Sequence, residues 1–444
     1  MKVLSVVGAR PNFMKVAPII TAIRAHNALL ARCFESRKEI PEAVDHVLVH
    51  TGQHYDQALS DSFFADLGLP EPDYNLGVGS GSHAAQTAEI MRKFEEVLLR
   101  ERPDVLIVVG DVNSTLACAL VAAKISFDAS GRRPLIAHVE AGLRSFDRTM
   151  PEEVNRVLTD QVSDILFTTE RGALDNLTRE GVPAEKVRFV GNTMIDSLLA
   201  YRDKANASAI LHTLGLCSGA ANGNSGRSTA PYALLTLHRP ANVDSRDAFL
   251  NIVEGLDELC GQCAVVFPAH PRTRQRIADF ALHGHFSAGP PRAGKIGIIE
   301  PLGYIDFLCL MSHAKLVVTD SGGIQEETTC LGIPCVTVRE NTERPITVEN
   351  GTNMLAGVRK DGIREAVRRQ LEKTFSNEAP PKWDGGAAGR IVEILLSASH
   401  VRSVDRGARR ESTVFENVDL SKGAAARLDR SGLAGPRDST CPLS

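Results

Sequence analysis

The run Val105-Leu106-Ile107-Val108-Val109-Gly110-Asp111 is a short apolar segment that ends in a glycine and a carboxylate. A continuous β-branched run of this length is typical of a parallel strand buried on both faces of a sheet. In an open α/β sheet, ligands bind at the carboxyl ends of such strands. The run therefore predicts a doubly wound α/β domain with Asp111 at its ligand-binding edge.

Strand and helix patterns alternate along most of the 444 residues, in two successive series. The first series has strand patterns at Val3–Val7, Val47–His50, Val105–Val109 and Leu135–Val139, and helical patterns at Pro18–His26 and Thr87–Arg100. The second series has strand patterns at Leu234–Leu237, Val265–Pro268, Ile296–Glu300, Leu316–Thr319 and Cys335–Val338. Two such series predict two Rossmann-like, doubly wound domains that face each other across a cleft.

The domain boundary is expected after Gly191, close to the helical pattern Met194–Lys204. This division gives an N-terminal domain of residues 1–191 and a C-terminal domain of residues 192–380. Residues 218–231 are rich in Gly, Ser, Asn and Ala, which indicates a flexible surface insertion. In residues 399–444 the apolar periodicity is lost, and we expect this tail to be poorly ordered.

Composition excludes several classes of protein. The net charge of −4 argues against a nucleic-acid-binding protein, whose footprint is a basic face. No apolar run is long enough to span a bilayer, and the first residues lead directly into a strand, so we expect a cytoplasmic protein without a membrane partner. The nine cysteines are scattered and odd in number, and the lone pair Cys260 and Cys263 favours packing over metal or redox chemistry.

Three carboxylates follow one another at strand ends or helix starts of the first series. Asp111 follows the strand Val105–Val109, Glu140 follows Leu135–Val139, and Glu152 lies in the first turn of a helix that begins at Pro151. Each acid alone could cap a helix or pair with an arginine. Three in succession at the ligand edge favour proton transfer to and from carbon or oxygen.

A diphosphate site is predicted by the stretch from Thr319 to Glu327. Ser321, Gly322 and Gly323 form a turn between a strand and a helix, where the backbone can approach a diphosphate and the helix dipole favours its charge. Glu327 is placed one turn into the helix to accept hydrogen bonds from ribose hydroxyls, and Arg344 is a possible diphosphate partner. The GK[ST] signature of a P-loop is missing, so we expect a nucleotide diphosphate held without a bound metal.

Two further stretches are candidates for the same site. Gly8-Ala9-Arg10-Pro11 ends the first strand and opens a helix that contains Lys15, so free amides and two cations could meet an anion, although a plain helix start explains the glycine equally well. His238 ends the first strand of the second series. It is a candidate general acid or phosphate contact.

Taken together and in order, these stretches resemble the non-hydrolysing UDP-N-acetylglucosamine 2-epimerases over roughly residues 1–398. The resemblance rests on Gly8–Pro11 with Lys15, Gly110-Asp111, His138–Arg144, Pro151–Arg156, Thr319–Glu327 and Thr342–Pro345. It implies a GT-B-like architecture, a homodimer, and a last helix near Arg390–Leu396, within residues 381–398, that returns to the N-terminal domain.

The resemblance also implies an activity. These isomerases interconvert UDP-GlcNAc and UDP-ManNAc, which supplies ManNAc-type sugars for cell-surface polysaccharide. The proton at C2 is removed while UDP leaves C1, and UDP then adds back to the enzyme-bound 2-acetamidoglucal, with neither NAD nor a metal. The resemblance assigns acid/base chemistry to Asp111, Glu140, Glu152 and His238. It assigns UDP contacts to Arg10, Lys15, Ser321, Gly322, Gly323, Glu327 and Arg344, and it places Phe307 near the uracil.

Other functions stay open at this stage. A related subfamily epimerises UDP-2,3-diacetamido-2,3-dideoxyglucuronate and shares the style of His50–Tyr55 and Ser145–Glu153. A retaining glycosyltransferase, a hydrolysing epimerase and a sugar-nucleotide sensor without catalysis are further alternatives. The sensor finds support only in Ala241, which stands where the family usually has a glutamate in its HRxEN motif.

Overall fold

The computed structural model describes residues 1–33, 43–53, 68–218, 228–289, 294–375 and 378–398. The expected tail, 399–444, and the middle of the expected insertion, 219–227, lie outside these residues. Met1–Leu396 form one compact unit, and the following description concerns that unit.

The first sheet has seven parallel strands in the order β3-β2-β1-β4-β5-β6-β7. The strands are β1 (Lys2–Val7), β2 (Asp45–His50), β3 (Tyr74–Asn75), β4 (Val105–Val109), β5 (Leu135–Val139), β6 (Ile165–Thr168) and β7 (Val187–Phe189). The strand order reverses between β1 and β4, which is where a doubly wound sheet opens for a ligand.

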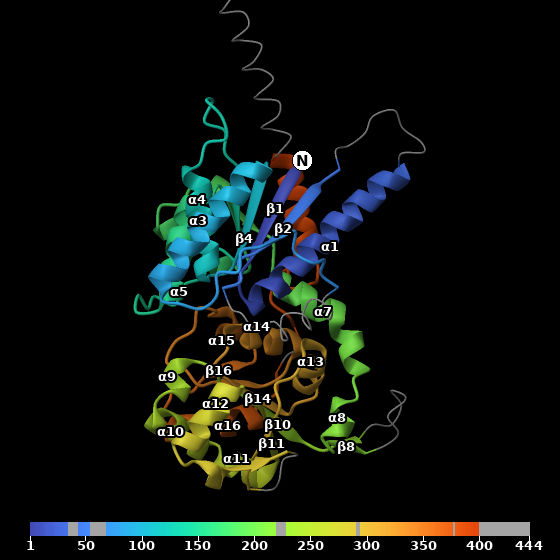
Figure 1. Cartoon of the computed structure of the whole chain (residues 1–444). Coiled ribbons are helices and arrows are strands. Elements are labelled where there is room, and N and C mark those ends of the chain that lie inside the picture. Colours follow the sequence, from blue (N-terminus) through green and yellow to red (C-terminus); the bar gives the residue numbers. More distant parts are fainter. Residues whose placement is uncertain (34–42, 54–67, 219–227, 290–293, 376–377, 399–444) are drawn as a thin grey trace, which may run out of the picture. The chain divides into compact units, whose positions relative to one another are not determined.

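Helices cover both faces of this sheet. In Figure 1, α3 and α4 lie on one side of β1 and β4, and α1 lies on the other. The helices are α1 (Arg10–Cys33), α3 (His83–Glu101), α4 (Asn113–Lys124), α5 (Pro151–Val162) and α6 (Arg171–Arg179), with a 3₁₀ turn η1 (Ala184–Lys186). Alternate strand residues such as Leu106 and Val108 pack against Phe94 of α3 in one buried cluster. Burial on both faces explains why the strands are apolar throughout.

Helix α1 corrects the expected helix Pro18–His26, because it begins eight residues earlier and runs through Pro18. A proline inside a helix cannot donate to the carbonyl four residues before it. Here that carbonyl belongs to Met14, and the hydroxyl of Ser197 donates to it at 2.6 Å. A hydrogen bond from another helix therefore replaces the one that Pro18 removes.

The second sheet also has seven parallel strands, in the order β12-β13-β11-β10-β14-β15-β16. The strands are β10 (Tyr232–Thr236), β11 (Ala264–Pro268), β12 (Phe286–Ala288), β13 (Ile296–Ile299), β14 (Leu316–Thr319), β15 (Cys335–Thr337) and β16 (Asn353–Leu355). Two seven-stranded parallel sheets confirm the predicted α/β class with two Rossmann-like domains.

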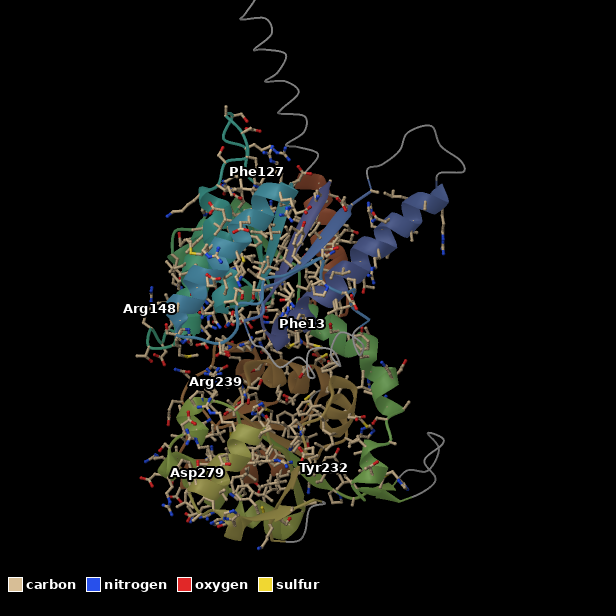
Figure 2. The ribbon with its side chains drawn as sticks, in the orientation of Figure 1. Phe13, Phe127, Arg148, Tyr232, Arg239 and Asp279 are labelled. Carbon is tan, nitrogen blue, oxygen red and sulfur yellow. The ribbon has the colours of Figure 1, made fainter. Side chains whose placement is uncertain are left out.

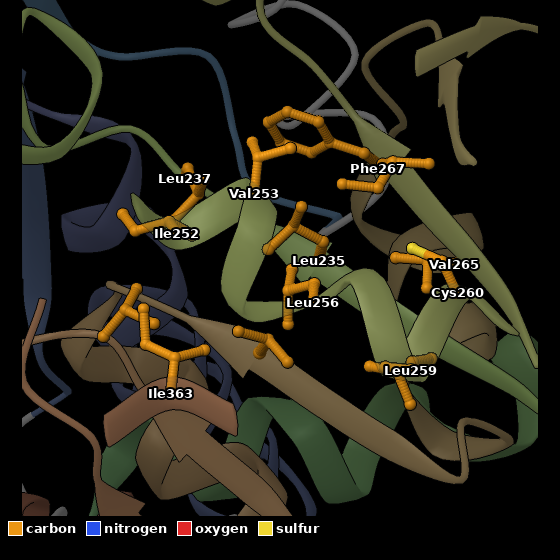
Figure 3. Packing of buried hydrophobic residues seen from close by; sticks show 14 of the residues in the cluster. Leu235, Leu237, Ile252, Val253, Leu256, Leu259, Cys260, Val265, Phe267 and Ile363 are labelled. Atoms are coloured by element: carbon orange, nitrogen blue, oxygen red, sulfur yellow. The ribbon is translucent and has the colours of Figure 1, made fainter. Parts of the chain in front are cut away.

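Helices also flank the second sheet. They are α9 (Pro240–Val243), α10 (Arg246–Gly255), α11 (Asp257–Gln262), α12 (Pro271–Asp279), α13 (Tyr304–Ser312), α14 (Gly322–Leu331), α15 (Ile346–Glu349) and α16 (Lys360–Glu372), with a 3₁₀ turn η2 (His283–His285). Figure 3 shows the apolar cluster in which Leu235 and Phe267 of the strands meet Ile252 and Ile363 of the helices. Cys260 is part of this cluster, and burial raises the pKa of its thiol to about 12. It is a packing residue.

The stretch between the sheets contains α7 (Thr193–Asn206), α8 (Ile210–Thr213) and a small hairpin of β8 (Cys217–Ser218) and β9 (Ser228–Thr229). Helix α7 contacts α1 as well as α13 and α14. The described ends of the expected insertion therefore pair with each other.

The chain crosses between the sheets twice, and the two crossings touch. Gly191 has a φ of +96°, and a side chain there would lie 2.1 Å from the carbonyl oxygen of Lys382. Beyond Lys382, the indole of Trp383 donates to Thr169 O at 3.0 Å, and a helix at 387–398 follows. The exact domain boundaries remain predictions. No helix in the described parts of the chain combines the length and the apolar character needed to cross a membrane.

Candidate active site

The expected site residues gather at the carboxyl ends of the central strands. In the first sheet, Gly8, Asp111 and Glu140 follow the adjacent strands β1, β4 and β5. In the second sheet, His238 and Ser321 follow the adjacent strands β10 and β14. Parallel strands end at the same edge, which explains why residues so distant in sequence come together.

Glu140 joins the two sheets electrostatically. Its side chain is buried, and its two carboxylate oxygens contact Lys15 Nζ at 2.7 Å and Arg344 Nη2 at 3.0 Å. The backbone of Glu140 has a φ of +73°, a left-handed conformation that costs a non-glycine residue on the order of 1–3 kcal/mol. Two hydrogen bonds to the Phe167 carbonyl, from the amides of Glu140 and Ala141, hold it there.

Arg344 lies among three carboxylates. Besides Glu140, its guanidinium pairs with Glu343 and lies 3.0 Å from Glu326. Burial would lower the pKa of Arg344, but these acids outweigh it, and the pKa is raised. Glu343 also pairs with Arg339 at 2.7 Å, and the two arginines lower its pKa against the effect of burial. A permanent buried cation therefore sits beside Glu140.

Two further buried acids, Glu326 and Glu170, have a raised pKa, in contrast to the lowered pKa of Glu343. Burial raises the pKa of Glu326 to about 7, although Arg344 lowers it. Burial, together with the charge of Glu326, raises the pKa of Glu170 to about 8. Glu170 follows β6, and its Oε2 has no hydrogen-bond donor among the described residues. Burial therefore moves the pKa of both carboxyl groups towards neutral pH.

Asp111 pairs with Arg156 of α5, whose side chain is also bonded to Glu153 at 2.8 Å. Asp111 keeps part of its side chain exposed, with a relative exposure of 23%. Glu152, in the first turn of α5, is exposed. Its negative charge opposes the lowering of the pKa of Arg239, which lies three residues after β10. Of the three expected acids, two are thus paired with cations and the third faces solvent.

His238 is oriented by an aspartate that the sequence reasoning did not select. Its Nδ1 lies 2.8 Å from Asp320 Oδ1, and the backbone amides of His238 and Arg239 also donate to this carboxylate. Figure 2 labels the side chain of Arg239. Burial would raise the pKa of Asp320, but these hydrogen bonds and the charge of His238 lower it. Because Nδ1 is occupied and the side chain is 62% exposed, Nε2 remains available for a ligand.

The register of the second sheet explains this pair. Thr236 of β10 lies beside Thr319 of β14, so the residues that follow them meet at the sheet edge. The aspartate in the Thr319-Asp320-Ser321 stretch was visible in the sequence. The sequence did not show that β10 and β14 are neighbouring strands, which is what brings Asp320 to His238.

The expected diphosphate turn lies at the start of α14, which begins at Gly322 directly after Ser321. A side chain at Gly322 would lie 2.5 Å from Arg344 Nη1 and 2.6 Å from Glu343 Oε1, so glycine lets the backbone approach this buried ion pair closely. Glu327, one turn on, accepts a hydrogen bond from Tyr304 at 3.2 Å. Phe307 lies on the same helix as Tyr304 and is half-buried.

The turn after β1 differs from the expectation of free amides. The amides of Gly8 and Ala9 both donate to Asn12 Oδ1, at 3.0 and 2.9 Å, which is how a helix start caps itself. The side chain of Arg10 lies outside the described residues. Lys15 reaches the site, as its contact with Glu140 shows.

Comparison with known proteins gives the family. A family model for UDP-N-acetylglucosamine 2-epimerase matches residues 38–396. The UDP-N-acetylglucosamine 2-epimerase of Methanocaldococcus jannaschii is 43% identical over 397 residues, covering 89% of this chain and 99% of that protein. The UDP-2,3-diacetamido-2,3-dideoxy-D-glucuronate 2-epimerase of Pseudomonas aeruginosa is 39% identical over 398 residues, with coverages of 89% and 99%.

Solved structures agree with this result. The M. jannaschii enzyme in complex with UDP-GlcNAc and UDP superimposes with a TM-score of 0.74 at 41% identity, covering 89% of this chain and 99% of that one. The Neisseria meningitidis enzyme bound to UDP-GlcNAc gives a TM-score of 0.72 at 29% identity, with coverages of 89% and 100%. This chain belongs to the UDP-N-acetylglucosamine 2-epimerase family.

Proposed function

We propose that this chain is a non-hydrolysing UDP-GlcNAc 2-epimerase that acts in the cytoplasm as a homodimer. The observation that carries the proposal is the contact of Glu140, from the first sheet, with Arg344, from the second, at 3.0 Å. This contact supports the proposal because it joins one expected acid/base group to one expected diphosphate contact, in a chain of this family.

The proposed reaction begins when a basic group removes the proton at C2 and UDP leaves C1, which gives 2-acetamidoglucal and UDP. Return of a proton to the other face of C2 and re-addition of UDP at C1 complete the epimerisation. Asp111, Glu140, Glu152 and His238 are the proposed acid/base residues. Because Nδ1 of His238 donates to the Asp320 carboxylate, Nε2 is suited to exchange a proton with the substrate.

The proposed UDP contacts are Arg10, Lys15, Phe307, Ser321, Gly322, Gly323, Glu327 and Arg344. The amino terminus of the ten-residue helix α14 favours negative charge, and Arg344 adds a cation beside it. Lys15 adds a second cation, which shares Glu140 with Arg344. Departure of UDP from C1 develops negative charge on the diphosphate, so these groups would stabilise the transition state more than the substrate.

The test is proton NMR of the purified protein with UDP-GlcNAc in D₂O. UDP-ManNAc with deuterium at C2 is the expected product, whereas free ManNAc would indicate a hydrolysing enzyme. Asp111→Asn should lower turnover by about 10²–10⁴-fold while the Kd of UDP stays within a few-fold. Asp175→Asn on the exposed face of α6 is the matched control and should retain full activity. A mild effect of Asp111→Asn would remove it from the acid/base groups.

A second substrate deserves the same assay. The P. aeruginosa relative, at 39% identity, is named for UDP-2,3-diacetamido-2,3-dideoxy-D-glucuronate. If UDP binds but UDP-GlcNAc shows no deuterium exchange, turnover of the diacetamido-uronate would identify it as the substrate. Binding of UDP with no turnover of either sugar would indicate a sugar-nucleotide sensor.

A further inference from the structure

His138 lies directly behind the proposed acid/base groups, and the proposed mechanism does not use it. It is a fully buried residue of β5, two positions before Glu140. Its Nε2 is 2.8 Å from the carbonyl oxygen of Gly110, and its Nδ1 is 2.7 Å from Asp160 Oδ1. Both ring nitrogens therefore face oxygen atoms.

Asp160, on α5, is a carboxylate. Its other oxygen, Oδ2, accepts hydrogen bonds from the amide of Gly142 at 3.0 Å and from Arg144 Nη2 at 2.7 Å. Burial would raise the pKa of Asp160, but the charges and hydrogen bonds of His138 and Arg144 outweigh burial and lower it. Arg144 in turn donates to Glu180 through Nε at 2.8 Å.

A carbonyl and a carboxylate can only accept hydrogen bonds, so both nitrogens of His138 must donate. The ring is then an imidazolium. Two cations, His138 and Arg144, alternate with two anions, the buried Asp160 and the partly exposed Glu180, so the network has no net charge. Pairing of this kind is what permits charges in a protein interior.

The network reaches both turns that carry proposed acids. Gly110 directly precedes Asp111 and has a φ of +65°, and its amide donates to Val139 O at 3.0 Å while its carbonyl accepts from His138. Gly142 follows Glu140 by two residues, has a φ of +79°, and donates to Asp160. Both peptide segments are therefore held from behind by the same ion pair.

We infer that His138, as an imidazolium fixed by Asp160, is a positioning residue for epimerisation, because it holds the Gly110–Asp111 peptide in place. The role rests on the proposed function, since it requires Asp111 to act on a substrate. A displacement of about 1 Å in a catalytic group can reduce the rate on the order of 100-fold.

Two substitutions of His138 separate positioning from general stability. The amide nitrogen of asparagine occupies roughly the place of Nδ1, and that of glutamine roughly the place of Nε2. His138→Asn keeps a donor for Asp160 and loses the one for Gly110. We expect it to lower kcat by about 10–100-fold with KM and the Kd of UDP within about threefold. His138→Gln keeps the donor for Gly110, and we expect its kcat to stay within about threefold of wild type.

Asp164→Asn is the matched control at the opposite ends of the same strands. Asp164 pairs with Arg133 at 2.7 Å and accepts the amide of Ile136, far from the proposed acids. It should lower the melting temperature and leave kcat unchanged. A kcat of His138→Asn within threefold of wild type, or no better activity in His138→Gln, would overturn the positioning role.

A measurement without substrate tests the charge of the ring directly. In ¹⁵N-histidine-labelled wild-type protein at pH 7.5, His138 should show two protonated ring nitrogens, assigned by their loss in His138→Asn. A single ring N–H for His138 would refute the imidazolium. Wild-type protein that turns over neither sugar, yet shows both ring protons, would overturn the proposed function and leave the buried ion pair standing.

Discussion

Glu170→Gln should make the protein more stable at alkaline pH and leave it nearly unchanged at pH 5. Glu170 is 97% buried, with no donor for Oε2 among the described residues, and its pKa rises from 4.5 to about 8. A carboxyl group with a raised folded-state pKa stabilises the fold fully below its unfolded pKa. This contribution is lost as pH rises towards the folded pKa.

The two pKa values set the size of the effect. At about 1.4 kcal/mol for each tenfold change in proton affinity, the loss between pH 4.5 and 8 is roughly 4 kcal/mol. That is a large part of the ~5–15 kcal/mol by which proteins are stable. Glutamine has the shape of the protonated acid and does not ionise. The variant should therefore gain up to about 4 kcal/mol over wild type near pH 8.5.

Urea unfolding from pH 5 to 9 would measure this difference, with the slope m checked to be equal for the two proteins. Glu185→Gln, at an exposed position in η1 beyond α6, is the control and should follow wild type at every pH. Parallel curves for Glu170→Gln and wild type across this range would refute the assignment of a buried, protonated Glu170. Glu326 still titrates in both proteins, so only the difference between the curves is diagnostic.

Three other substitutions test the site and its supports. Ser197→Ala removes the hydroxyl that donates to Met14 O, the carbonyl that Pro18 leaves without a helical donor. It should lower the unfolding free energy by about 1–3 kcal/mol, measured by urea denaturation. An unchanged unfolding free energy would show that this carbonyl has another hydrogen-bond donor. Asp320→Asn releases His238 and should lower kcat by about 10²–10⁴-fold in the deuterium-exchange assay, whereas a wild-type kcat would exclude an oriented histidine. The same substitution should remove the stability that the ionised Asp320 gives the wild-type fold, which wild type loses only as pH falls below about 4. Arg344→Ala leaves buried carboxylates unpaired and should cost about 3–5 kcal/mol of stability, measured by calorimetry. Titration calorimetry should also show weaker UDP binding, and an unchanged Kd would remove Arg344 from the UDP contacts.

The sequence by itself determined the fold class and the edge at which the site lies. Strand patterns such as Val105–Val109 and Leu135–Val139 coincide with β4 and β5, because a strand buried on both faces must be apolar along its whole length. The glycine turn at Ser321 and Gly322 likewise marks the start of α14. These signals are local, since each depends on residues that are neighbours in the chain.

Even local patterns failed where a distant residue intervened. The expected helix at Pro18–His26 begins too late because Ser197, on α7, supplies the hydrogen bond that a proline prevents. The expectation of free amides after β1 fails for a local reason instead, because the side chain of Asn12, three and four residues along the chain, accepts hydrogen bonds from both of them.

Only the tertiary structure decided how the charged groups are paired. Glu140 and Arg344 are 204 residues apart in sequence and 3.0 Å apart in space. The pairing of His238 with Asp320 follows from the fact that β10 and β14 are neighbouring strands. The raised pKa of Glu170 likewise follows from its burial in the assembled fold. Electrostatic energies depend on distance and on access to water. Neither quantity can be obtained from residue order before the sheets are assembled.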